Sequence, residues 1–154
     1  MKSPLFYHKK PMFGLDIGSQ TVKHMQLMVH ARHAVVQAYG SVATDEKIMQ
    51  NGVVTNIPQA AKLVDQLLSE HTTGKLTTNR VVMSIPVSHV FTRVLTLPTM
   101  SKKELDSAVR LEVEQSVPMP TKNLYFDYEI TDIGDPENVL VRLVAAPREI
   151  VDSY

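Results

Sequence analysis

A stretch near the N-terminus combines a carboxylate, a glycine turn and a lysine, and these groups can hold a phosphate together with a divalent cation. Gly18 has no Cβ that would keep a phosphate away from the backbone, and consecutive N–H groups around it can converge on an anion. Asp16 would be a hard oxygen ligand for Mg²⁺, usually through retained water, and Lys23 would add a compact positive charge. The candidate nucleotide-binding residues are Asp16, Gly18, Ser19, Gln20, Thr21 and Lys23.

The residues on both sides of this stretch predict a β-hairpin with residues 16–20 at its tip, because apolar and β-branched residues flank a Gly-Ser turn. The four-residue pattern D-x-G-S also occurs in ordinary turns, which is the alternative reading of these residues. The six histidines and the remaining carboxylates form no acid/base pair or nucleophile arrangement. His30 and His33 have a spacing that could hold a metal, but two histidines at a turn without a third ligand are typical of solvated residues.

The composition is that of an ordinary globular domain. The chain has 154 residues, of which 44% are hydrophobic and 21% charged. Sixteen basic and sixteen acidic residues cancel, so the net charge gives no indication of nucleic-acid binding. The absence of cysteine excludes disulfides and thiolate chemistry. No apolar run is long enough to span a membrane, and residues 1–10 lack the apolar core of a signal peptide, so we expect a flexible leader there.

Local patterns predict the other elements. Asn51-Gly52 indicates a turn. A helix is expected after Asn56 as N-cap with Pro58 in its first turn, ending at Gly74. Ser101 and Glu104 form a capping box for a second helix that must end before Pro118. A last helix begins at Pro147. Strands are expected at 34–42, 80–86, 90–98, 124–130 and 139–146.

Longer strings resemble a known family. The string G-L-D-I-G-S-Q-T-V-K at 14–23 resembles the first phosphate-binding hairpin of the superfamily that contains actin, heat-shock chaperones and sugar kinases. The strings V-M-S-I-P at 82–86, L-T-L-P at 95–98 and E-V-E-Q-S-V-P at 112–118 look most like the PilM family of type IV pilus assembly, which is related to the cell-division protein FtsA.

The resemblance implies a fold class of α/β and α+β: a partial actin-like (ribonuclease H-like) subdomain 1A with an inserted strand-helix-strand-strand subdomain 1C. The expected divisions are a leader at 1–10, the first part of 1A at 11–78, the 1C-like module at 79–146 and a return into 1A at 147–154. The family's second phosphate loop and its adenosine-binding segment do not occur, so we expect an N-terminal fragment. In the full-length protein the resemblance implies ATP and Mg²⁺ and at most a weak ATPase, with little binding by the fragment.

The resemblance also implies a partner. PilM-like proteins bind the cytoplasmic N-terminal peptide of the inner-membrane pilus protein PilN in a groove between 1A and 1C, whose lining the sequence does not identify. The expected location is therefore cytoplasmic, at the inner membrane through that partner. An FtsA-like division protein, a sugar or acyl-phosphate kinase, and an α+β interaction domain without nucleotide stay open as alternatives. Uncovered apolar surface and an unpaired sheet edge also predict self-association.

Overall fold

The computed structural model describes residues 10–30, 32–45, 47–131 and 135–154. The expected leader therefore lies, apart from Lys10, outside the described residues. The chain divides into two compact units, Met1–Ser84 and Ile85–Tyr154.

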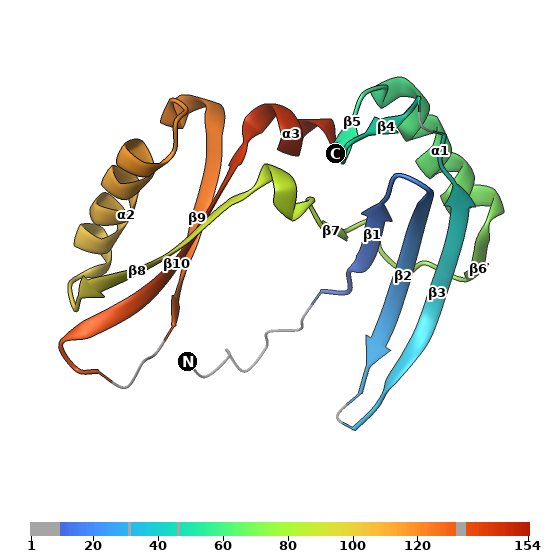
Figure 1. The fold of residues 1–154 in the computed structure, drawn as a ribbon. Coiled ribbons are helices and arrows are strands. Elements are labelled where there is room, and N and C mark those ends of the chain that lie inside the picture. The colour runs from blue at the N-terminus through green and yellow to red at the C-terminus, as the bar shows by residue number, and fades with distance from the viewer. Residues whose placement is uncertain (1–9, 31, 46, 132–134) are drawn as a thin grey trace. The chain divides into compact units, whose positions relative to one another are not determined.

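The first unit is built on a five-stranded sheet in the order β6-β3-β2-β1-β7 (Figure 1). β1 (Phe13–Ile17), β2 (Thr21–Val29) and β3 (Ala34–Ala43) form an antiparallel meander, which confirms the predicted hairpin and the predicted strand after it. β6 (Thr72–Gly74) pairs antiparallel with β3, and β7 (Val81–Met83) pairs parallel with β1. The sheet thus joins segments that lie more than sixty residues apart in the sequence.

One face of this sheet is buried and the other is open. α1 (Ile57–Glu70) packs against β2, β3 and β6. Burial alternates along β1 and β2, as it must when successive side chains point to opposite faces. The buried residues of β1 and β2 are Phe13, Leu15, Ile17, Val22, His24 and Gln26. Two polar residues of β2 therefore face the core.

The start of α1 follows the prediction, and its end does not. The Asn56 side chain accepts the N–H of Gln59 at 3.1 Å, and Pro58 lies in the first turn. The helix ends at Glu70, with His71 as its C-cap. Gly74 was predicted to end the helix and instead lies in β6, because the chain after His71 is already paired with β3.

A small hairpin precedes α1. β4 (Met49–Gln50) and β5 (Val53–Val54) pair antiparallel around the predicted turn. Asn51 and Gly52 have φ values of 51° and 76°, the left-handed conformation that Asn-Gly favours in two-residue hairpin loops. The turn is confirmed, and its two-residue strands were not predicted.

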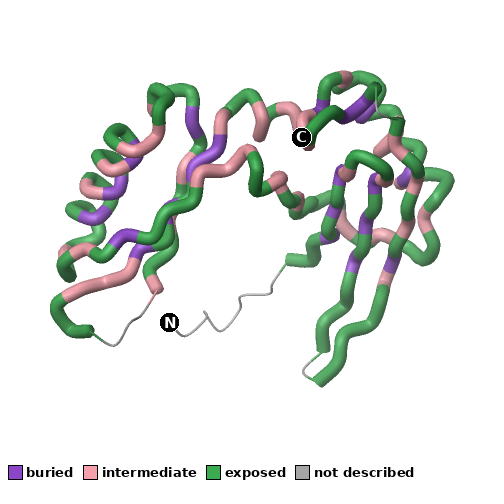
Figure 2. The backbone as a smooth tube through the Cα atoms, viewed as in Figure 1, coloured by how far each residue is buried: buried purple, intermediate pink, exposed green. Residues whose placement is uncertain are grey.

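The second unit is a three-stranded antiparallel sheet with α2 (Lys102–Ser116) on one face. β8 (Phe91–Pro98), β9 (Leu124–Thr131) and β10 (Asn138–Pro147) are arranged in the order β8-β10-β9 (Figure 1). Single-turn 3-10 helices precede β8 at Val87–His89 and β9 at Thr121–Asn123. Figure 2 shows buried positions recurring along α2 and β10. The core residues are Leu95, Leu105, Val109, Val113, Leu124, Val141 and Leu143.

The start of α2 is fixed by the predicted capping box. The Ser101 hydroxyl accepts the N–H of Glu104, and the Glu104 carboxylate accepts the Ser101 N–H at 2.9 Å. Hydrogen bonds from Ser101 lower the pKa of the Glu104 carboxyl, as expected when they favour the charged form. This local sequence signal therefore defines where the helix begins.

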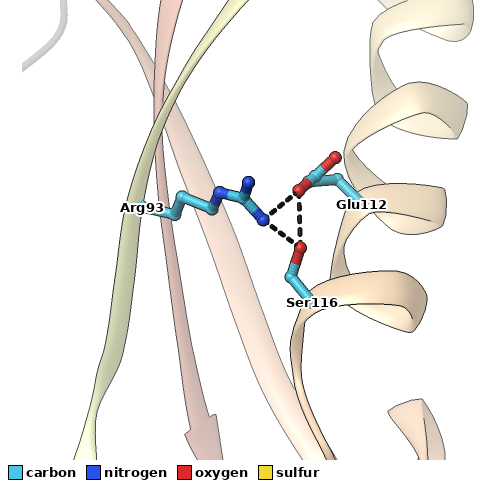
Figure 3. A network of polar contacts seen from close by, with 3 residues as sticks. All are labelled: Arg93, Glu112 and Ser116. Atoms are coloured by element: carbon cyan, nitrogen blue, oxygen red, sulfur yellow. Dashed lines mark hydrogen bonds and ion pairs between the residues drawn. The ribbon is translucent and has the colours of Figure 1, made fainter.

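A polar network ties the end of α2 to β8 (Figure 3). Arg93 Nη1 lies 2.6 Å from Glu112 Oε1, and Arg93 also donates to the Ser116 hydroxyl. Ser116 in turn donates to Glu112 Oε1 at 2.5 Å. Glu112 and Ser116 belong to the string at 112–118 that resembles the family. These two residues therefore stabilise the packing of α2 on β8.

The last helix, α3 (Arg148–Ser153), starts one residue after the predicted Pro147, which is its N-cap, and packs on β9 and β10. The Arg148 guanidinium lies 4.0 Å from the centre of the Tyr125 ring, within the range of a cation–π contact. The division between the units at Ser84 differs from the expected boundary at 78/79, because β7 pairs with β1 and lies in the first sheet.

Candidate functional site

The tip of the β1–β2 hairpin is a tight turn. The Gly18 N–H donates to the Thr21 carbonyl at 3.0 Å, and a Cβ on Gly18 would lie 3.0 Å from the same oxygen. The Gln20 carbonyl accepts the N–H of Thr44 at 2.9 Å. The Gly18 N–H thus closes the turn and is not directed at an anion. The predicted N–H donors are then those of Ser19 and Gln20, whose side chains are exposed.

Asp16 and Lys23 lie next to each other on the open face of the sheet. They are direct partners in the β1–β2 register, and both are exposed. Opposite charges at directly paired positions are close enough to interact. Asp16 was predicted to lie at the tip of the hairpin. In the structure it is the second-last residue of β1. The hairpin therefore presents one carboxylate and one ammonium beside its turn.

A third polar group reaches this carboxylate from a distant segment. The Ser84 hydroxyl donates to Asp16 Oδ1 at 3.4 Å, because the parallel pairing of β7 with β1 brings the end of β7 beside Asp16. Sequence reasoning noted the string that contains Ser84 but assigned it no role. No local sequence pattern could have predicted the contact between Ser84 and Asp16, because it depends on the crossover that pairs β7 with β1.

The open face beside these residues forms a shallow hollow of about 600 Å³, most of it apolar. Met25, Tyr39 and Val82 supply exposed apolar surface next to the charged pair. The side chains of Asp16, Lys23, Met25, Tyr39, Ser41, Val82 and Ser84 line it. A predominantly apolar hollow with few polar groups is the usual character of a ligand or packing site.

On the opposite, buried face, polar residues of β2 hold the segment that follows α1. His24 Nε2 lies 2.8 Å from the Thr72 hydroxyl, which donates to the Leu67 carbonyl at 3.0 Å. Gln26 donates to the Thr77 hydroxyl and accepts the Thr77 N–H at 2.7 and 2.9 Å. Burial lowers the pKa of His24, because the charged imidazolium loses hydration there. These contacts hold β2 against the segment that follows α1.

The donor set around Asp16 fits a Mg²⁺–phosphate group in part. A single carboxylate suits Mg²⁺, which keeps several waters and takes further oxygens from substrate phosphates. Among the described residues, histidine and carboxylate side chains form no cluster of three or more that could hold a metal. For such a group the hairpin would offer the carboxylate of Asp16 and the ammonium of Lys23, and the Ser84 hydroxyl contacts that carboxylate.

A second hollow, of about 610 Å³, lies between α2 and β9. The Tyr128 hydroxyl donates to Asp106 Oδ1 at 2.5 Å there. This hydrogen bond is the main reason why the pKa of Tyr128 is raised, because it favours the protonated phenol. The contact joins β9 to α2.

Comparisons with known proteins agree with this architecture. The fold of the two units is that of an actin-like protein. The family model of the type IV pilus assembly protein PilM matches residues 14–154. The chain belongs to this family. In the part that the structure describes, no helix is both long enough and apolar enough to cross a bilayer.

The individual relatives belong to type IV pilus biogenesis and to type II secretion. A solved PilM–PilN type IV pilus biogenesis complex contains a chain that is 26% identical, with a TM-score of 0.76, and the match covers 92% of this chain and 42% of that one. The type II secretion system protein L of Xanthomonas campestris pv. campestris is 29% identical over 68 residues, which is 44% of this chain and 18% of the relative.

The cytoplasmic domain of EpsL, an inner-membrane component of the Vibrio cholerae type II secretion system, has a TM-score of 0.52 at 12% identity. That match covers 94% of this chain and 50% of the other, and it concerns the fold alone. The chain therefore spans half or less of the length of these relatives.

Proposed function

We propose that the chain forms part of a nucleotide-dependent scaffold of type IV pilus assembly. The observation that carries this proposal is the paired carboxylate and ammonium of Asp16 and Lys23 beside the hairpin turn, in a chain of the PilM family. A scaffold role requires binding and a change of state, and no catalytic acid/base pair is needed for it.

In this proposal the hairpin supplies half of a Mg²⁺–ATP site in the longer protein. Asp16 would hold Mg²⁺ through water, and Ser84, which donates to Asp16 Oδ1, would fix the carboxylate. Lys23 would neutralise phosphate charge, and Ser19, Gln20 and Thr21 would contact phosphate oxygens from the turn. The bound Mg²⁺–nucleotide would supply a charge-dense ligand that links the hairpin to the rest of the protein.

The proposed partner is the cytoplasmic N-terminal peptide of a PilN-like inner-membrane protein. Support comes from the solved PilM–PilN complex, whose matching chain covers 92% of this sequence. Such a peptide would place the protein in the cytoplasm at the inner membrane. An apolar anchor in a preformed slot is the expected mode of binding.

A second candidate is an equivalent scaffold role in type II secretion. The 29% identity to type II secretion system protein L over 68 residues favours it. The two candidates differ in the membrane protein that is bound.

The nucleotide proposal predicts that Asp16→Ala, made in the longest natural form of the protein, weakens Mg²⁺–ATP affinity roughly tenfold or more, as loss of an outer-sphere carboxylate does in other metal sites. Equilibrium binding of a fluorescent ATP analogue with and without Mg²⁺ measures this. Asp65→Ala removes an exposed carboxylate on α1 and should leave the affinity unchanged. Equal affinity of Asp16→Ala and the parent protein would contradict the assigned role.

The partner proposal predicts saturable heat in a calorimetric titration with a synthetic N-terminal peptide of the PilN-like protein from the same organism. A scrambled peptide of the same composition is the control. Saturable binding of a peptide from the corresponding type II secretion component, and none of the PilN-like peptide, would favour the second candidate. Circular dichroism establishes that the protein is folded in either case.

A further inference from the structure

The distal part of the β2–β3 hairpin projects beyond the rest of its sheet (Figure 1). β1 pairs with β2 only as far as Met25, and β6 pairs with β3 only over residues 38–40. Residues 27–30 and 32–36 therefore form a two-stranded ribbon, here called the β2–β3 arm. Two-stranded ribbons are marginally stable alone, and contact with a partner stabilises them.

The arm is apolar on both faces. Leu27 and Val36 are direct partners on one face, and Met28 and Val35 are partners on the other. Their exposed fractions lie between 46% and 49%, and that of Val29 is 77%. Figure 2 shows the arm as continuously exposed. A partner that covered a single face would leave the other apolar face in water.

The outer edge of the arm is open for a further strand. Beside Ala34, Val35 and Val36, the described residues include no strand on the side away from β2. Proteins usually protect such edges with charges or proline. The edge strand β9 of the second unit shows such protection, because the Asp127 carboxylate accepts the N–H of Tyr128 at 2.8 Å. The corresponding stretch of β3 contains no charged residue and no proline.

The charged side chains of the arm and of the neighbouring stretch of sequence are all basic. No Asp or Glu occurs from Ile17 to Thr44, while the arm carries Arg32 between His30 and His33 at its tip. The two imidazole rings are stacked with centres 4.7 Å apart. A binding segment would therefore gain from carboxylates placed opposite Arg32.

We propose that the β2–β3 arm binds an extended segment of a partner protein that has apolar residues at adjacent positions and carboxylates at its ends. The segment adds as a strand to the outer edge of β3 beside residues 34–36. Because an added strand sends its side chains alternately to both faces, it covers both apolar faces of the arm. This inference does not depend on nucleotide binding.

Two other occupants fit the arm less well. The hydrocarbon of a bilayer leaves the open edge N–H and C=O groups unsatisfied, and insertion from the tip would bury Arg32. A second copy of the arm would place no carboxylate opposite Arg32, because no Asp or Glu occurs from Ile17 to Thr44. A peptide with apolar residues and terminal carboxylates would pair with the N–H and C=O groups of the open edge. It would also cover both apolar faces and place carboxylates near Arg32.

The test uses the whole chain and a peptide that carries fluorescein at its N-terminus, fluorescein-Glu-Val-Val-Thr-Val-Val-Glu-amide, in fluorescence anisotropy. Its four valines point in pairs to the two faces of an added strand. The matched control peptide has Lys in place of both Glu. We expect saturable binding of the acidic peptide and at least tenfold weaker binding of the basic one, since both contain the same apolar residues. Arg32→Glu should weaken acidic-peptide binding about fivefold, and Val35→Asp about tenfold.

Two variants control for general effects of these changes. Lys62→Glu makes the same charge reversal at an exposed position of α1, and Val94→Asp changes an exposed valine of the edge strand β8. Both should bind the acidic peptide as the parent chain does. Equal binding of the two peptides, or equal binding by Val35→Asp and Val94→Asp, would overturn the proposal.

Two other results would also overturn it. Sedimentation with vesicles of phosphatidylcholine and phosphatidylglycerol that depends on Val35 and Arg32, without peptide binding, would identify a lipid surface as the occupant. Concentration-dependent association that is lost in Val35→Asp, again without peptide binding, would identify a second copy of the chain. Circular dichroism and thermal unfolding establish that each variant is folded.

Discussion

His24 is the residue at which burial has the clearest chemical consequence. Its side chain is 3% exposed, its Nε2 contacts Thr72, and its Nδ1 has no hydrogen-bond partner among the described residues. Because Thr72 donates its own proton to the Leu67 carbonyl, His24 must be the donor in the contact with Thr72. His24 Nε2 therefore carries a proton, and burial favours the neutral form of the imidazole because it lowers the pKa of His24.

This preference for the neutral form predicts how stability depends on pH. Burial lowers the pKa of His24 in the folded chain, whereas in the unfolded chain it has its ordinary value near 6.5. Below that value the unfolded state binds the proton first, so the free energy of unfolding falls as the pH falls, until the lowered native pKa is reached. At pH values above the ordinary pKa of histidine, His24 is neutral in both states and does not lower the free energy of unfolding.

Urea unfolding of the parent chain and of His24→Gln at about pH 7.5 and about pH 5.5 measures this effect. Gln keeps an amide donor for Thr72 and cannot be protonated, so the variant should lose less stability on acidification. His33→Gln, which replaces an exposed histidine of the arm, should keep the pH dependence of the parent chain. If His24→Gln also keeps it, His24 is not its source.

At the scale of elements, the end of α1 packs closely on β3. A Cβ on Gly40 would lie 2.2 Å from the His71 carbonyl oxygen and 2.8 Å from His24 Nε2. The first of these atoms belongs to the backbone and cannot turn away. The close approach of α1 to the sheet thus depends on a residue without a side chain at this position.

Gly40→Ala should therefore lower the free energy of unfolding by about 2 kcal/mol, the usual cost of overpacking a tight contact. Gly14→Ala is the matched control, because its Cβ would meet only the Met25 carbonyl at 3.8 Å in the neighbouring strand. Thermal and urea unfolding of both variants measure the difference. Equal stability of the two would show that the end of α1 can move away from β3 at little cost.

At the scale of the whole molecule, the open face of the five-stranded sheet exposes apolar side chains of the first unit. Met25, Tyr39 and Val82 are each about half exposed on it, with Asp16 and Lys23 at one end. Exposed apolar patches of this kind mark contact surfaces or promote association. The predicted self-association would use this face.

We expect the average mass of the chain in static light scattering to rise with concentration, and Met25→Lys to suppress the rise because it places a charge in the centre of the face. Val87→Lys changes an exposed apolar residue of the second unit and should leave the association unchanged. A mass that stays monomeric at all concentrations would contradict the prediction.

The sequence by itself determined the features that depend on neighbouring residues. The capping box at Ser101, the Asn51-Gly52 turn and the strands around Gly18 were predicted, since each depends on contacts within a few residues. The family resemblance was read from strings of the same kind, and the family model matches residues 14–154. The assignment of nucleotide and partner stays a prediction.

Only the tertiary structure decided which face of each strand is covered. Alternation along β2 separates Val22, His24 and Gln26 from Met25 and Leu27, but it does not show which set faces α1. His24 and Gln26 can be buried because Thr72 and Thr77 form hydrogen bonds with them. These partners lie about fifty residues away in the sequence. In the same way, Ser84 reaches Asp16 only because β7 crosses over to pair with β1, a long-range contact that no local pattern encodes.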